Sequence, residues 1–462
     1  MSAPVEELAL RCILPGFAGT TAPDWVRRRA AQGLGGVALY ARNVEDSDQV
    51  RRLSDSLHAE RSGLLVAVDE EGGDVTRLEA RTGSSYPGNL ALGVAGDVFL
   101  TEEVAASIGA ALARVGVDLD LAPVVDVNSN PQNPVIGVRS FGSDPVAVAN
   151  QAAAWIRGLQ GAGVAACAKH FPGHGDTAVD SHVALPVAGE DPHLGALEPF
   201  VAAINEGVRA IMSAHIVVPS IDDRPATISP RVMTGLLRDE LGFTGLAVSD
   251  GLEMRGLTAP GGLAESAVLA LVAGCDLLCV GGGLAEAETV DELVDAIVGA
   301  VESGRLTEGR LRQAASRVDA LAEWRHRPRP ASRERRETGL AAARQAVIAD
   351  GRVQVGDEAE VVRFEPPASL AAGEVPWGVE ASLAARGVKI GVPGKSLVVL
   401  VRDLHRHPEQ RHQVEALLAR RPDAVLVEMG LPLCRPQGAR AYITTHGASR
   451  ASAVAAAEVM RP

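Results

Sequence analysis

Residues 169–182, KHFPGHGDTAVDSH, hold one lysine, three histidines and two aspartates within fourteen positions. An aspartate two residues before a histidine, as at Asp180 and His182, can turn its carboxylate onto one imidazole nitrogen and leave the other for a ligand. Such a pair can exchange protons near neutral pH, because the unperturbed pKa of histidine is about 6.5. An isolated Asp-X-His more often caps its own loop, but the density of ionisable side chains here favours a catalytic pair.

Asp250 is a second candidate for chemistry. It ends the run 246–250, LAVSD, and precedes a glycine. A carboxylate held at the end of a strand is a natural nucleophile for the anomeric carbon of a sugar. An aspartate at this place could equally cap a following helix. The residues alone leave both interpretations open.

A third group of residues could grip a polar substrate. Asp69 ends an apolar run, Arg77 lies eight residues later, and Arg139 belongs to the loop sequence NPVIGVRSFG. Carboxylates and guanidinium groups that converge on a pocket bind vicinal hydroxyls with directional hydrogen bonds, although each could instead form an ordinary salt bridge. Lys169 is one of only three lysines, so we expect it to have a specific hydrogen-bonding role.

The same segment could be read as a zinc site, since five of its side chains are suitable ligands: His170, His174, Asp176, Asp180 and His182. The spacing does not match an HExxH or paired CxxC pattern. The charge of Lys169 would also oppose a divalent cation. We therefore expect no metal and no cofactor.

The elements that must position these residues are visible as apolar runs. Between residue 12 and about residue 282, eight such runs alternate with helical stretches: 12–17, 36–42, 64–69, 117–124, 164–169, 210–215, 246–250 and 276–281. Their nearly continuous hydrophobicity is typical of parallel strands covered on both faces. Eight strands predict an α/β fold of the (β/α)8 TIM type, which places its chemistry at the carboxyl ends of the strands. An open, doubly wound sheet is the alternative, but polar residues at five or more strand ends favour the barrel.

A second domain is predicted after the barrel. The Pro- and Arg-rich stretch 326–337 indicates a linker, which gives a catalytic domain over 1–328 and a smaller α/β domain over 329–462. In the second domain we expect strands at 360–366, 397–402, 424–429 and 439–445, and helices at 341–348 and 448–460.

Composition narrows the partners. The net charge of −14, with no basic block longer than RERR at 333–336, argues against nucleic acid and against an anionic membrane surface. A small neutral or polar substrate fits better. The N-terminus lacks the features of a secretory signal, no run of about 18 apolar residues occurs, and the five cysteines lie mostly in apolar runs. We expect a soluble cytoplasmic protein.

Several motifs occur in one order: KHFPGHGDT, DSH, SAH at 213–215, PAT and SP within 225–230, and SDGLEM. Together they resemble the bacterial β-N-acetylglucosaminidases (β-N-acetylhexosaminidases) of glycoside hydrolase family 3, over about residues 10–325. The resemblance implies a retaining hydrolase that removes terminal β-linked N-acetylglucosamine. By this resemblance Asp250 is the nucleophile and His182, oriented by Asp180, is the acid/base.

The resemblance further implies that five residues bind the sugar: Asp69, Arg77, Arg139, Lys169 and His170. The chain departs from the family motif EGGR at Asp74, and the second domain supplies no residue to this list. A neutral imidazole does not repel an anion, so a phosphorylase with inorganic phosphate as acceptor is the main alternative. A metal-dependent hydrolase and a non-catalytic carbohydrate-binding protein are alternatives of another class.

Overall fold

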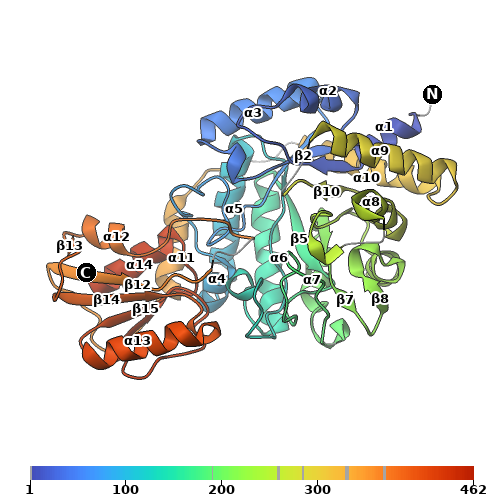
Figure 1. The fold of residues 1–462 in the computed structure, drawn as a ribbon. Coiled ribbons are helices and arrows are strands. Elements are labelled where there is room, and N and C mark those ends of the chain that lie inside the picture. The colour runs from blue at the N-terminus through green and yellow to red at the C-terminus, as the bar shows by residue number, and fades with distance from the viewer. Residues whose placement is uncertain (1–2, 190, 258–260, 283–285, 328–331, 368–370) are drawn as a thin grey trace.

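The structure is a computed structural model that describes residues 3–189, 191–257, 261–282, 286–327, 332–367 and 371–462. Figure 1 shows a larger α/β part, coloured blue to yellow, and a smaller α/β part, coloured orange to red. The chain folds in two sheet-based parts, as the sequence predicts. The predicted boundary at 328/329 falls within residues 328–331, which lie outside the described residues, and we retain it as a proposal.

Eight parallel strands form the larger part. Six lie in one continuous sheet, in the order β2 (Gly36–Leu39), β3 (Leu65–Val68), β4 (Leu119–Asp120), β5 (Ala165–Phe171), β6 (Ala210–Ser213) and β9 (Leu246–Val248). The remaining two, β1 (Ile13–Pro15) and β10 (Leu278–Val280), pair with each other. Leu277, just before β10, bridges to Val248 of β9. All eight strands occur where the apolar runs predict them.

The six-stranded sheet curls into a TIM-like half-barrel, which β10 and β1 continue. On the far side, the N–H of Gly35, before β2, donates to the carbonyl of Leu10, before β1, at 3.2 Å. The predicted fold class, an α/β barrel followed by a smaller α/β domain, is confirmed.

Helices alternate with the strands and lie outside the sheet (Figure 1). They are α1 (Val5–Arg11), α2 (Asp24–Gln32), α3 (Ser47–Glu60), α4 (Asn89–Ala95), α5 (Val98–Arg114), α6 (Pro145–Gly161), α7 (Glu198–Asn205), a π-helix (Arg231–Glu240), α8 (Gly262–Ala273), α9 (Ala287–Glu302) and α10 (Glu308–Arg325). Short 3-10 turns occur at Ala41–Asn43, Gly137–Arg139, Pro192–Leu194, Ala226–Ile228 and Arg255–Leu257, and β7 (Val217–Val218) pairs with β8 (Asp222–Pro225).

Local sequence explains where several of these helices begin. The side chains of Asp46, Asp97 and Asp144 accept hydrogen bonds from the first free backbone N–H groups of α3, α5 and α6. Aspartate is among the preferred residues at this position, because its carboxylate satisfies donors that the helix itself cannot.

The strands are buried on both faces. In β3, Leu65 and Ala67 face the barrel interior, whereas Val66 and Val68 pack in the layer between strands and helices. Because neither face meets water, the strand sequence does not alternate between apolar and polar residues. The polar residues are therefore confined to the strand ends, where the candidate site lies.

The smaller part contains a six-stranded sheet. Its order is β11 (Ile348–Asp350), β16 (Ala441–Thr444), β15 (Val425–Glu428), β14 (Ser396–Val401), β12 (Glu358–Arg363) and β13 (Lys389–Ile390), with β11 antiparallel to β16 and the other neighbours parallel. Helices α12 (Glu380–Ala385) and α14 (Arg450–Met460) cover one face and α13 (Pro408–Arg420) the other. A 3-10 turn over Leu404–Arg406 follows β14.

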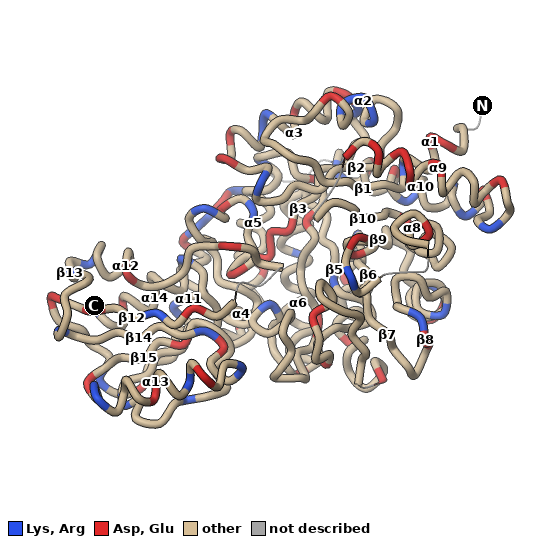
Figure 2. Tube along the Cα trace, in the orientation of Figure 1, with Lys and Arg blue, Asp and Glu red and all other residues tan. Residues whose placement is uncertain are grey.

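The four strands predicted for this domain and its closing helix are present. Helix α11 (Arg336–Ala346) packs on α14 of its own domain and on α4 and α5 of the barrel. Basic and acidic residues are interspersed over both parts of the chain (Figure 2). None of the helices among the described residues is both long enough and apolar enough to cross a membrane.

Candidate active site

A cavity of about 320 Å³ opens at the carboxyl ends of the barrel strands. Seven of the eight predicted site residues line it: Asp69, Arg77, Arg139, Lys169, His170, His182 and Asp250. The eighth, Asp180, lies behind His182 and bonds to it. The barrel thus brings together residues that are up to about 180 positions apart in the sequence, as expected when chemistry is placed at strand ends.

Asp250 lies two residues beyond β9. One of its carboxylate oxygens accepts a hydrogen bond from the N–H of Gly251 at 2.8 Å. Burial opposes the charge of Asp250, but nearby imidazoles, chiefly His215 and then His170, together with that N–H, lower its pKa to about 2. Asp250 is therefore an anion at neutral pH, as a nucleophile must be.

His215, which ends the sixth predicted strand run, holds the backbone next to Asp250. Its Nε2 donates to the carbonyl of Gly251 at 2.9 Å, and its Nδ1 lies 2.8 Å from the hydroxyl of Thr227. Burial lowers the pKa of His215. A neutral imidazole fixed at both nitrogens holds the backbone next to Asp250 in place.

His182 and Asp180 form the pair that their spacing predicts. The Nδ1 of His182 donates to Asp180 Oδ1 at 2.7 Å, and the backbone N–H of His182 donates to the same oxygen at 2.9 Å. Burial alone would lower the pKa of His182, but the hydrogen bond to Asp180 and the charge of Asp250 raise it above its ordinary value. Because Nδ1 is occupied, Nε2 is the nitrogen left for the cavity.

A network of charged side chains forms another wall of the cavity. The ammonium of Lys169 lies 2.7 Å from Asp69 Oδ1 and 2.8 Å from Glu71 Oε1. Arg139 binds Glu71 with two parallel hydrogen bonds, of 3.0 and 2.7 Å. Arg77 lies 3.8 Å from the second carboxylate oxygen of Asp69. Lys169 therefore has the hydrogen-bonding role that we expected, and its side chain is only 3% exposed.

Glu71 is the residue that sequence reasoning missed. Burial would raise its pKa, but Arg139 and Lys169 outweigh burial and hold the pKa well below its usual range. The sequence DEEGGD at 69–74 offers four carboxylates after β3, and the sequence analysis predicts only Asp69 as a site residue. The glycine pair after Glu71 indicates a tight turn and is the local signal for this position.

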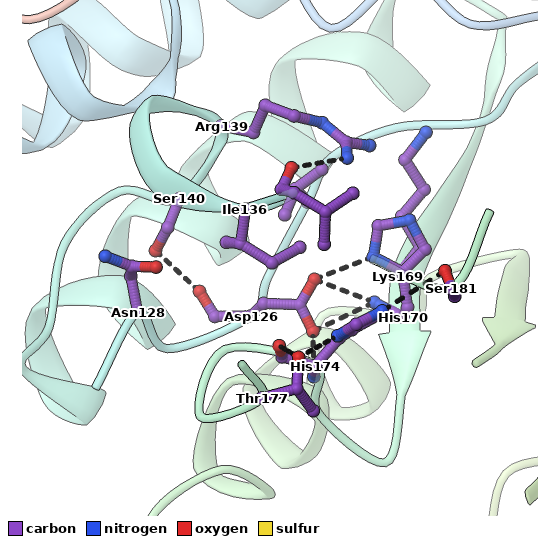
Figure 3. Close-up of polar contacts among 12 residues, drawn as sticks. Asp126, Asn128, Ile136, Arg139, Ser140, Lys169, His170, His174, Thr177 and Ser181 are labelled. Atoms are coloured by element: carbon purple, nitrogen blue, oxygen red, sulfur yellow. Dashed lines mark hydrogen bonds and ion pairs between the residues drawn. The ribbon is translucent and has the colours of Figure 1, made fainter. Parts of the chain in front are cut away.

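His170 is oriented by a buried aspartate (Figure 3). Its Nδ1 lies 2.7 Å from Asp126 Oδ2, and Asp126 also accepts the backbone N–H groups of His170 and His174. The ring of His174 contacts Thr177 and Ser181 at 2.6 and 3.3 Å, so it holds the loop together. Burial lowers its pKa to about 4.

Among the residues that the structure describes, no group of three or more His, Cys, Asp or Glu side chains is arranged to hold a metal ion.

The sequence of residues 21–321 matches the family description "Glycosyl hydrolase family 3 N terminal domain". The chain belongs to glycosyl hydrolase family 3. The resemblance inferred from the motifs is therefore confirmed.

Two named relatives match part of the chain, and one solved structure matches all of it. "Beta-hexosaminidase A" of Pseudoalteromonas piscicida is 34% identical over 331 residues, 65% of this chain and 55% of that protein. "Beta-hexosaminidase" of Methylobacillus flagellatus is 40% identical over 267 residues, 55% of this chain and 76% of that protein. The chain thus spans about half the length of the first relative. A solved family 3 β-N-acetylglucosaminidase from Paenibacillus sp. str. FPU-7 is 32% identical, with a TM-score of 0.90, covering 100% of this chain and 97% of that one.

The second domain, to which the resemblance assigned no sugar-binding residue, reaches the cavity of this family 3 chain. Ala371 lines the cavity, and Arg77 donates to the carbonyls of Ala371 and Ala372 at 2.9 and 3.2 Å. Asp74, where the chain departs from the motif EGGR, does not line this cavity and binds Arg402 of the second domain. The departure therefore concerns the contact between domains.

Proposed function

We propose that the chain is a retaining glycosidase that removes terminal β-linked N-acetylglucosamine. The observation that carries this proposal is that an ionised Asp250 and the Asp180–His182 pair share one cavity of the size of a sugar ring and its substituents. The sugar itself is inferred from the relatives, which are named β-hexosaminidase and β-N-acetylglucosaminidase.

In the first step, a carboxylate oxygen of Asp250 attacks the anomeric carbon and forms a glycosyl ester. The bond from that carbon to the glycosidic oxygen breaks, and the departing oxygen takes the proton from Nε2 of His182. The negative charge of Asp180, 2.7 Å from Nδ1, stabilises the protonated imidazole before the transfer and fixes its orientation.

In the second step, the neutral Nε2 of His182 takes a proton from water, and the resulting hydroxide attacks the anomeric carbon. The bond to Asp250 breaks and the carboxylate is restored. Two inversions at one carbon give retention of configuration. One residue thus acts as acid and then as base, which requires a group whose pKa lies near the working pH.

The charged wall binds the sugar in this mechanism. Asp69 and Lys169 hold each other at 2.7 Å, so both are fixed before substrate arrives. His170, held by Asp126, presents its free nitrogen to the same cavity. Groups fixed in this way lose little freedom on binding, which favours the transition state.

Trapping of the glycosyl ester tests the proposal. With a fluorinated N-acetylglucosaminyl fluoride, which forms the ester faster than it loses it, we expect the protein mass to rise by one sugar residue on the peptide containing Asp250. D250N should show no adduct and lose at least ~10³-fold in kcat on 4-nitrophenyl N-acetyl-β-glucosaminide. An adduct on another carboxylate, or full turnover by D250N, would refute the assignment of Asp250.

A further inference from the structure

Several contacts between the two domains gather on one segment, residues 69–85, which follows β3. Asp74 makes one of these contacts with a side chain that is only 6% exposed. Its Oδ2 accepts a hydrogen bond from Arg402, and its Oδ1 accepts one from the backbone N–H of Ala448 at 2.8 Å. Both donors belong to the second domain, so this carboxylate is held from there on both oxygens.

Further contacts fix the second half of the same segment. Arg450, the first residue of α14, donates to Glu79 Oε1 at 2.8 Å and to the carbonyl of Gly83 at 3.3 Å. Arg77 is held by the carbonyls of the second domain already described. The segment that carries Asp69, Glu71 and Arg77 therefore rests on the second domain at several points.

Asp74 is joined rigidly to Glu71. The backbone N–H of Glu71 donates to the carbonyl of Val75 at 3.0 Å and closes a tight turn. Gly72 and Gly73 inside the turn have φ angles of 74° and 63°, in the left-handed region that favours glycine. A Cβ on Gly73 would lie 2.4 Å from the Cα of Gly88. Because the turn is so tightly packed, a displacement of Asp74 must also displace Glu71.

Glu71 in turn sets the cations of the sugar site, since both Lys169 and Arg139 bind its carboxylate. We propose that Arg402 is a positioning residue: through Asp74 it holds the turn of residues 71–75, and so the second domain sets the sugar affinity of a cavity built almost entirely by the barrel. This inference rests on the proposed function, because it concerns the same site.

The test compares D74N, R402Q and the double variant D74N/R402Q in the full-length chain. For each, the inhibition constant of N-acetylglucosamine and the kcat and KM on 4-nitrophenyl N-acetyl-β-glucosaminide are measured, with the Tm as a check on folding. R402Q leaves the Asp74 carboxylate buried without its cation. We expect its inhibition constant and KM to rise about tenfold while kcat stays within about threefold of wild type, because ground-state binding is lost in preference to chemistry.

The double variant separates a specific pair from general damage. The double variant leaves no unpaired charge, so its inhibition constant for N-acetylglucosamine should be no higher than that of R402Q. Such a result is non-additive, whereas the effects of independent sites add. R402K keeps the charge and should raise the inhibition constant only about threefold. R344Q is the matched control, because Arg344 pairs with Glu458 within the second domain, at 2.7 Å and partly exposed, and it should bind the sugar as wild type does.

The inference would be overturned if R402Q, R402K and the double variant all kept the wild-type inhibition constant. If wild type also turned over the substrate, the proposed function would remain intact. If R402Q does not fold, R402K and the double variant carry the test by the same criterion. Absence of wild-type turnover on the aryl glucosaminide would instead contradict the proposed function.

Discussion

Asp180 Oδ1 accepts two hydrogen bonds from His182, one from the ring Nδ1 at 2.7 Å and one from the backbone N–H at 2.9 Å. The carboxylate therefore fixes both the position of the residue and the tautomer of its ring. It also raises the pKa of the imidazole, against the effect of burial. The loop thus leaves Nε2 as the nitrogen that faces the cavity.

The first prediction concerns pH. In the proposed mechanism the first chemical step needs His182 protonated and Asp250 ionised, and the pKa of Asp250 is about 2. The kcat/KM on an alkyl N-acetyl-β-glucosaminide should therefore fall as pH rises through the raised pKa of His182. In D180N the imidazole loses its anion, so this decline should move to lower pH, and kcat/KM at neutral pH should fall about 10²-fold. The pH profiles of both proteins check this, and coincident profiles would contradict the pairing.

The second prediction concerns the leaving group. H182A removes the proposed proton donor, and the loss of activity depends on how much the departing oxygen needs that proton. On an alkyl aglycone we expect a loss of at least ~10²-fold in kcat/KM, and on 2,4-dinitrophenyl N-acetyl-β-glucosaminide a loss of less than about tenfold. H193A, on an exposed 3-10 turn outside the cavity, is the matched control. Equal losses by H182A on both substrates would argue against an acid role.

Features that depend on local sequence patterns can be predicted from the sequence, whereas contacts between residues far apart in the chain cannot. The strands of the barrel were predictable, because covering on both faces makes runs such as 64–69 continuously apolar. Asp250 and His182 were predictable because each lies at or after a strand end within a distinctive motif. The hydrogen bond between Asp74 and Arg402 joins residues 328 positions apart, and no local pattern encodes such a pair.

Glu71 illustrates a second limit, which is orientation. Glu70 and Glu71 are identical neighbours in the sequence, but Glu70 accepts the backbone N–H groups of Arg77 and Leu78 at 2.8 and 2.9 Å, whereas Glu71 binds two cations of the cavity. Which of the two side chains faces the site depends on the turn that follows. Only the folded backbone decides this.

The third prediction uses these two neighbours as a matched pair. E71Q leaves Lys169 and Arg139 without their shared anion, and breaking a buried ion pair costs about 3–5 kcal/mol. We expect the free energy of unfolding, from urea denaturation at pH 7.5, to fall by about that amount. Activity should fall as well, since both cations lie in the cavity. A loss below about 1 kcal/mol would show that Glu71 is not the centre of this network.

E70Q is the control and should behave oppositely. Burial raises the pKa of Glu70 to about 7 from 4.5. The folded protein therefore holds a proton there that the unfolded chain has lost, so this residue reduces stability as pH rises from about 4.5 to 7. In E70Q that decline should be absent, and stability at pH 7.5 should be equal to or above that of wild type. Urea titrations at pH 5 and 7.5 measure the difference.

The fourth prediction decides between water and phosphate as acceptor. The cations of the cavity already contact carboxylates: Lys169 contacts Asp69 and Glu71, Arg139 contacts Glu71, and Arg77 lies near Asp69. A phosphate dianion would have to compete with these carboxylates, whereas water would not. We therefore expect free N-acetylglucosamine as the product, at a rate that inorganic phosphate up to about 50 mM changes by less than twofold once ionic strength is matched. The products are resolved by anion-exchange chromatography, with sulfate as the control anion.

A phosphate-dependent rate with N-acetylglucosamine 1-phosphate as product would assign the chain to the phosphorylases instead. The neutral imidazole of His182, which does not repel an anion, would then explain how phosphate enters the cavity.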